Sequence, residues 1–320
     1  MKRSVVVSLA MLSAALLCSI GTRSVTAADK TLVVGFAQTG AESGWRTANT
    51  LSIQETAKER GIDLHFVDAQ GVADNQKKAI SSFIAQQVDV IMFSPLVTDG
   101  WNPILKDAKD AGIPVIISDR RVSSPDNLYA CFIGSNFKEE GVKAGEWLAK
   151  KTGGKAMIAE IQGTVGSAPA TDRKSGFEEA ISKYPDMKVI MSQTGEFTRA
   201  KGKEVMETFL KRPDAGQITA VFAHNDDMAL GAIQAIKDAG KKPGKDIIVV
   251  SIDGVHDAFQ AMLDGDLNCT VECNPLLGPA LFDAAAKVAK GETVPKVIYS
   301  EEGVFEQSQV TPELLKSRKY

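Results

Sequence analysis

Short runs of apolar, often β-branched residues recur along the chain. Eight of them are almost continuously apolar instead of alternating with polar residues, which is typical of strands buried on both faces of a sheet. They cover residues 31–37, 64–68, 89–94, 114–118, 155–161, 188–193, 218–223 and 247–252. Helical stretches lie between them, and those at 46–60, 106–111 and 228–239 are each followed by a glycine, a helix stop signal. This alternation predicts an α/β fold with parallel sheets covered by helices on both sides.

The strand and helix units fall into two blocks, residues 31–130 and 150–255. Three further apolar segments stand apart from these blocks, at 129–133, 269–272 and 297–305, the second followed by a helix at 276–290. Isolated strands beside two α/β blocks predict that the chain crosses three times between two lobes. We expect crossovers near 131–133, 269–273 and 300–303, one lobe from 28–130 plus 274–299, and the other from 134–268 plus 304–320.

The first 27 residues have the pattern of a secretory signal peptide. Lys2 and Arg3 precede an uncharged apolar run at 4–20, and the following segment suits cleavage after Ala27. A transmembrane anchor fits less well, because the run is short and no second span follows. Lipid attachment at Cys18 is disfavoured by Leu17, which stands where a small residue is needed. We therefore expect export to the periplasm without membrane insertion.

The composition excludes several classes of protein. Among 320 residues, 44% are hydrophobic and 24% charged, as in ordinary globular proteins. The 37 basic and 40 acidic residues give a net charge of −3, which lacks the positive surface that nucleic acid requires. Of the cysteines beyond the signal peptide, Cys269 and Cys273 would lie roughly 13 Å apart on one strand, too far to bridge. Cys131 could bridge either one, although three small, buried thiols is the favoured interpretation. No cysteine and histidine spacing indicates a metal site.

Polar side chains follow the predicted strands at their carboxyl ends, where open parallel sheets bind ligands. Carboxylates there can accept hydrogen bonds from sugar hydroxyls, guanidinium and amide groups can donate to them, and an aromatic ring can pack on the C–H face of a sugar. The sequence therefore predicts a monosaccharide site. Its candidate residues are Gln38, Ser43, Trp45, Arg46, Asp119, Arg120, Arg173, Phe197, Asn225 and Asp253.

Each candidate also has a purely structural explanation. Asn225 could cap a helix, Asp253 could belong to a tight turn, and Trp45 could be a core residue. Arg121 is expected to be a solvated neighbour of the site. By contrast, Arg173 at a helix start would oppose the helix dipole, which favours a ligand role. The convergence of several such residues on one sheet edge favours binding.

The hypothesis that the protein is an enzyme has less support in the sequence. It contains no G-x-S-x-G elbow and no Walker loop, and the segment at 163–166 lacks dinucleotide-binding spacing. A glycosidase would need two carboxylates facing one sugar, and Asp119 with Asp253 could form that pair. This alternative stays open on spacing alone.

Several motifs together resemble a known family. They are Ser43-Gly44-Trp45-Arg46, Asp119-Arg120, the segments at 162–166 and 172–177, Ala223-His224-Asn225-Asp226-Asp227 and Ser251-Ile252-Asp253-Gly254. With them, nearly the whole chain beyond the signal peptide resembles the type I periplasmic sugar-binding proteins of ABC uptake systems, the ribose- and galactose-binding group. The Ser-Gly-Trp-Arg motif and the run around Arg173 point to its galactofuranose-binding members.

The resemblance implies two Rossmann-like lobes that close on one monosaccharide, galactofuranose or a related furanose or pentose. It assigns Trp45, Arg46, Asp119 and Arg120 to one lobe's contacts, Arg173, Asn225 and Asp253 to the other's, and Phe197 to ring stacking. It also places Cys273 among the ligand-binding residues, where ribose-binding relatives carry glutamine, and this difference argues against ribose.

The resemblance further implies no catalysis, no cofactor and no metal, and a monomer that delivers sugar to a membrane permease with its ATPase. A receptor that feeds a sensor is an open alternative. A sugar-responsive repressor is not, because an exported signal stands where its DNA-binding helices would be. Asp119→Ala or Arg173→Ala is expected to abolish binding while leaving the fold intact.

Overall fold

Two six-stranded sheets organise the part of the chain that the computed structural model describes, residues 30–320. In the first sheet every neighbouring pair is parallel. Its strand order is β11 (Val297–Tyr299), β5 (Cys131–Gly134), β4 (Val115–Ser118), β3 (Val90–Phe93), β1 (Val33–Gln38) and β2 (Asp63–Asp68). The predicted signal peptide, residues 1–27, lies outside the described residues. Between residues 30 and 320, none of the helices combines the length and apolar character needed to cross a bilayer.

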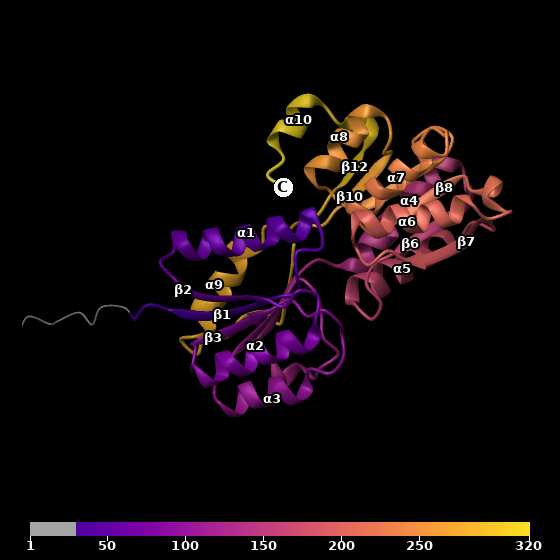
Figure 1. Cartoon of the computed structure of the whole chain (residues 1–320). Coiled ribbons are helices and arrows are strands. Elements are labelled where there is room, and N and C mark those ends of the chain that lie inside the picture. Colours follow the sequence, from indigo (N-terminus) through magenta and orange to yellow (C-terminus); the bar gives the residue numbers. More distant parts are fainter. Residues whose placement is uncertain (1–29) are drawn as a thin grey trace, which may run out of the picture. The chain divides into compact units, whose positions relative to one another are not determined.

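Four helices cover the two faces of the first sheet (Figure 1). α1 (Gly44–Glu59) and α9 (Gly278–Val288) lie on one face, and α2 (Ala73–Ala85) and α3 (Asn102–Asp110) on the other. Successive side chains of a strand point to opposite faces, so Met92 packs with Ile53 of α1 and Phe93 with Phe83 of α2. Burial on both faces explains why these strands are continuously apolar in sequence. We call this sheet with its helices the first lobe.

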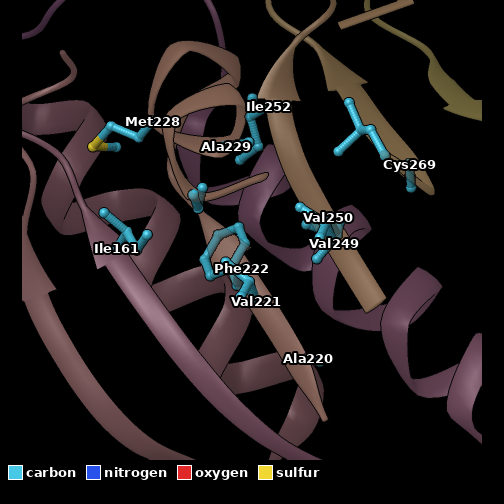
Figure 2. Packing of buried hydrophobic residues seen from close by; sticks show 14 of the residues in the cluster. Ile161, Ala220, Val221, Phe222, Met228, Ala229, Val249, Val250, Ile252 and Cys269 are labelled. Carbon is cyan, nitrogen blue, oxygen red and sulfur yellow. The ribbon is translucent and has the colours of Figure 1, made fainter. Parts of the chain in front are cut away.

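The second sheet is parallel except at one edge, where β10 and β12 pair antiparallel. Its strand order is β12 (Val304–Glu306), β10 (Cys269–Glu272), β9 (Ile248–Asp253), β8 (Ala220–Ala223), β6 (Lys155–Gln162) and β7 (Asp186–Thr194). Six helices accompany it, α4 (Phe137–Thr152), α5 (Ala168–Ile181), α6 (Arg199–Leu210), α7 (Asp226–Asp238), α8 (His256–Asp264) and α10 (Pro312–Ser317). Figure 2 shows part of this core, with Ile161, Phe222 and Val250 on neighbouring strands and Met228 and Ala229 on α7. We call this sheet with its helices the second lobe.

The chain passes between the two sheets three times, which confirms the predicted architecture of two lobes joined by three segments. The passages run through residues 135–136, 273–277 and 300–303. The segment predicted as one strand at 297–305 is two strands, β11 in the first sheet and β12 in the second. Similarly, β5 and β10 do not stand apart but are hydrogen-bonded into the first and second sheets respectively. An apolar run marks a strand, but it does not tell which sheet the strand joins.

Close packing of α4 on α5 places two charged residues side by side. A Cβ atom on Gly141 would lie 2.1 Å from the carbonyl oxygen of Arg173, and one on Gly176 would lie 2.0 Å from that of Lys138. Only glycine allows the two backbones to approach this closely. Glu140 on α4 is consequently held against Arg173 on α5.

Candidate functional site

Side chains from both lobes and from one passage line a small cavity. The lining residues are Glu42, Ser43, Trp45, Arg46, Asp119, Arg120, Phe137, Pro169, Arg173, Phe197, Asn225, Asp253 and Cys273. All the aromatic and arginine side chains among them are at most 4% exposed, so the cavity is shielded from solvent.

The first lobe contributes an ion-pair network built around Arg46. Its Nη2 donates to Asp119 at 2.7 Å, its Nε to Glu42 at 3.1 Å, and its Nη1 to Gln38 and Ser94 at 3.2 and 3.3 Å. Burial alone would lower the pKa of Arg46, but Asp119 and Glu42 raise it above its usual value. Ser94 also donates to Asp119 at 2.9 Å. This half is therefore fixed by contacts within its own lobe.

Arg120 presents an unused donor to the cavity. Its Nη2 donates to Glu42 at 3.0 Å, and its guanidinium lies 5.3 Å from the ring centre of Phe197. Its buried Nε has no hydrogen-bond partner among the described residues. Burial and the neighbouring charge of Arg46 lower the pKa of Arg120. An acceptor on a ligand would satisfy this donor.

Arg173 anchors the second-lobe half. Its Nε donates to Glu140 at 2.7 Å and its Nη1 to the carbonyl of His224 at 2.5 Å. Its contact with Asp253 is longer, 3.4 Å from Nη2 to Oδ1. Burial alone would lower the pKa of Arg173, but the charges of Glu140 and then Asp253 raise it. The helix α5 begins at Ala168, so Arg173 lies in its second turn, and the expectation that it sits at a helix start is wrong.

Asp253 is held at the end of β9 by its neighbour in the core, Asp226. The buried carboxylate of Asp226 accepts from the backbone N–H of Gly254 at 2.7 Å and of Val255 at 2.9 Å, which shapes the turn into α8. Burial raises the pKa of Asp253 well above its usual value, and Arg173 opposes this only in part. Asp253 is thus a buried acceptor with a weak protein partner.

Phe197 and Asn225 complete the second-lobe wall. A Cβ on Gly163 would lie 1.9 Å from the Phe197 ring, so glycine at this position leaves room for the ring. Asn225 caps α7 by accepting from Met228 N–H at 3.0 Å, and its Nδ2 donates to the Phe197 carbonyl at 3.1 Å. The capping explanation for Asn225 therefore holds together with its place in the cavity wall.

Three of the six non-glycine residues with a positive φ in the described chain line the cavity. Asp119, Phe197 and Asp253 have φ angles of 61°, 63° and 133°, in the region that favours glycine. Non-glycine residues hold such angles at a cost of about 1–3 kcal/mol each, and they cluster at binding and active sites. These three residues stand at or shortly after the ends of β4, β7 and β9, and all three line the cavity.

Hydrogen bonds close the two lobes around the cavity. Trp45 Nε1 donates to the carbonyl of Cys273 at 2.7 Å, and the N–H of Gly44 at the start of α1 donates to Asp227 of α7 at 2.7 Å. Farther out, Thr98 N–H donates to the Gly166 carbonyl at 2.9 Å. Arg121 forms an ion pair with Asp172 across the lobes, so it is not simply a solvated neighbour. The structure is a closed form.

Ten of the eleven residues predicted for the site line the cavity. Gln38 does not line it, but lies behind Arg46 and also donates to Asn49 at 3.0 Å. Sequence reasoning missed Glu42, Phe137 and Pro169. Of these, Glu42 had a detectable signal, because it precedes Arg46 by four residues in the loop and first turn that carry the other candidates.

Among residues 30–320, one group of side chains has the spacing that a cation site would need. It is formed by Glu140, Cys273 and Glu302, whose donor atoms lie within 4.8 Å of one another. Its carboxylates already accept hydrogen bonds from Arg173, Ser135 and the N–H of Asn274, so we interpret it as a hydrogen-bonding cluster. The three cysteines of the described chain, Cys131, Cys269 and Cys273, are buried and unbridged.

Comparison with known proteins gives consistent matches over most of the chain. The family model described as periplasmic binding protein domain matches residues 34–293. The galactofuranose-binding protein YtfQ of Escherichia coli (strain K12) is 51% identical over 268 residues, 83% of this chain and 84% of that protein. The periplasmic component of the arabinose ABC transporter of Shewanella sp. ANA-3, bound to α- and β-L-arabinofuranose, has 54% identity and a TM-score of 0.87, covering 90% of this chain and 96% of that one. A protein of Mycobacterium smegmatis in complex with β-D-fucofuranose has 54% identity and a TM-score of 0.85, with 88% and 93% coverage.

Proposed function

The chain belongs to the periplasmic binding protein family, and from this membership we propose that it binds one neutral monosaccharide in furanose form for an ABC uptake system. Its similarity to proteins named or solved as binders of galactofuranose, L-arabinofuranose and D-fucofuranose supports a furanose ligand.

The balance of charge in the cavity carries this proposal. Three guanidinium groups line it, and so do the carboxyl groups of Glu42, Asp119 and Asp253. Behind the lining, Glu140 is also paired with Arg173, so the cavity has no surplus of positive charge. A sugar acid or sugar phosphate would leave an uncompensated buried charge, which is strongly unfavourable. A neutral polyol, by contrast, accepts hydrogen bonds from the guanidinium groups and donates them to the carboxylates. The cavity chemistry therefore favours an uncharged sugar.

Two features of the wall match a sugar ring in particular. Arg120 Nε is a buried donor without a hydrogen-bond partner in the described part of the chain, and Asp253 is a buried acceptor with only a long contact. Trp45, Phe137 and Phe197 add apolar area against which C–H groups can pack. A ligand with hydroxyls at its rim and C–H groups on its faces can bind both the polar groups and the apolar rings.

Closure supplies the mechanism of recognition. The sugar contacts are complete only when the lobes meet, so the sugar stabilises the closed form over the open one. The closed surface would then be recognised by the membrane permease and its ATPase. We propose periplasmic location after removal of residues 1–27, a monomer, and hinge boundaries near those expected from the sequence.

Binding without catalysis is part of the proposal. Glycoside hydrolysis uses two carboxyl groups that are free to act on the bond and on water or the sugar. Here Asp119 is bonded to Arg46 and Ser94, and Glu42 to two arginines. The cavity therefore does not offer the free pair that the glycosidase alternative requires.

Calorimetric titration of the protein without its first 27 residues tests the proposal. L-arabinose, D-fucose and D-galactose are expected to include at least one ligand with micromolar or tighter affinity, whereas D-galacturonate should not bind. With a sugar carbon-13 labelled at its anomeric carbon, the NMR shift of the bound form identifies the ring size. Absence of binding to all neutral sugars, a pyranose signal, or turnover of an aryl furanoside would contradict it.

A further inference from the structure

One carboxyl group joins all three passages between the lobes. Glu302 lies on the third passage, and its Oε1 accepts from the hydroxyl of Ser135 on the first. The same oxygen accepts from the backbone N–H of Asn274 on the second passage at 3.0 Å. Any hinge motion that separates the passages must change these contacts. Glu302 is therefore placed where closure can be sensed.

A second carboxyl group faces it. An oxygen of Glu140 lies within 4.8 Å of one from Glu302, and the Sγ of Cys273 lies within the same distance. Glu140 is 1% exposed, and its Oε1 has no hydrogen-bond partner among the described residues. Glu140 is buried and Glu302 is half-buried. Two carboxylates this close repel each other strongly when both are ionised, so one proton on the pair is favoured.

The surrounding charges do not remove this repulsion. Arg173 on α5 is shared between Glu140 and Asp253, and Lys143 on α4 donates to the main-chain carbonyl of Glu302 at 3.1 Å, not to its carboxylate. On β10, Glu272 is bound by Arg318 and Tyr320. The thiol of Cys273, whose pKa is raised by its own burial, is neutral. No cation of the described chain is thus left over for Glu302.

We propose that Glu140 and Glu302 share a proton in the closed form, and that this pair positions Arg173 and couples the hinge to the sugar site. The inference rests on the proposed function, because Arg173 is one of the cavity's donors. The contact chain is short, since Glu302 faces Glu140, and Glu140 accepts from Arg173 Nε at 2.7 Å. Both carboxyl groups act through Arg173 and are positioning residues.

The direction of the pH effect follows from the pair. Burial, and then the charge of Glu140, raise the pKa of Glu302 to about 9 from its ordinary 4.5. Because this pKa is raised, the bound proton stabilises the closed, folded form. The stabilisation is fully present below pH 4.5 and is lost as the pH rises through about 9. Opening the hinge exposes Glu302 to water and lowers its pKa. Sugar affinity should therefore fall as the pH rises.

The test compares sugar affinity at pH 6 and pH 9 in three proteins. For the wild type we expect at least about tenfold weaker binding at pH 9, since one unit of pKa difference corresponds to a factor of ten. Glu302→Gln imitates the protonated group and should keep nearly the same affinity at both values. Glu301→Gln, an exposed neighbour on the same passage, removes the same charge and should retain the wild-type loss.

A fourth variant and a second readout keep the outcomes distinct. Glu140→Gln should also flatten the pH dependence, but it should weaken binding at pH 6 because Arg173 loses its charged partner. Without sugar, the urea midpoint of the wild type should fall between pH 6 and pH 9 relative to that of Glu302→Gln. A wild type that binds sugar equally at both pH values overturns the inference and leaves the proposed function intact. If no sugar binds, the proposed function fails, and the urea midpoints alone decide whether the proton is shared.

Discussion

In the first-lobe half of the cavity, the four charged side chains are bonded to one another within that lobe, whereas in the second-lobe half Asp253 has only a 3.4 Å contact. Asp119 accepts from Arg46 at 2.7 Å and from Ser94 at 2.9 Å. Asp253 has a pKa raised well above normal by burial, so the fold gains little from its charge. The first half is thus organised before the ligand arrives, and the second half holds an acceptor that the ligand completes.

The largest effect expected from this difference is on stability. Asp119→Ala leaves the buried Arg46 without its shortest ion pair, and loss of one partner from a buried pair costs about 3 kcal/mol of unfolding free energy. The sequence alone predicts that this variant keeps its fold intact, whereas the observed ion pairs predict that it is destabilised. Urea denaturation without sugar measures the loss. Asp253→Ala is the matched control and should lose less than about 1 kcal/mol, because its charge is weakly paired. Equal losses in the two variants would mean that the halves do not differ.

The next effect is on binding and its pH dependence. Asp253→Asn replaces a carboxyl group of the cavity wall and should weaken sugar binding by up to about tenfold, since a hydrogen bond contributes about 0.5–1.5 kcal/mol. Because the pKa of Asp253 is raised, its contribution to folding is fully present below pH 3.8 and declines as the pH rises. The variant should therefore gain stability relative to the wild type between pH 5 and pH 7.

Titration calorimetry and urea midpoints at both pH values check the Asp253→Asn variant. Wild-type affinity would remove Asp253 from the site. If the urea midpoint of the variant fell relative to that of the wild type between pH 5 and pH 7, the charge of Asp253 would be well paired in the folded protein.

Much of the fold could be predicted because burial leaves a direct trace in the sequence. Strands such as β3 and β4 are apolar on both faces, so their runs are found within a residue or two of the observed bounds. Asp119, Asn225 and Asp253 could be predicted for the site because each lies at a strand end or within two residues of it, where the topology collects side chains.

The missed residues depend on contacts between distant segments. Phe137 lines the cavity, and Glu140 contacts Arg173, because α4 and α5 pack backbone to backbone at Gly141, which no local pattern indicates. The apolar pattern predicts one strand at 297–305, whereas Glu302 lies on the passage between two strands of different sheets. Its position between the sheets could therefore not be predicted. Arg121 looked solvated because its partner Asp172 belongs to the other lobe. Local patterns therefore identify strand ends, but not the contacts made across the closed interface.

The smallest effect concerns the closed interface outside both halves. Arg121 and Asp172 pair across the lobes while remaining 35% and 25% exposed, so the pair should add only about 0.2–1 kcal/mol to closure. Arg121→Ala is expected to weaken sugar binding by at most about fivefold, mainly through faster dissociation, and less at high salt because the pair is screened. Stopped-flow dissociation at low and high salt measures this. Lys138→Ala breaks an exposed pair with Glu179 inside the second lobe and should leave dissociation unchanged. Opening the lobes breaks the Arg121–Asp172 pair but not the Lys138–Glu179 pair. If the two variants changed the dissociation rate equally, the Arg121–Asp172 pair would not contribute to closure.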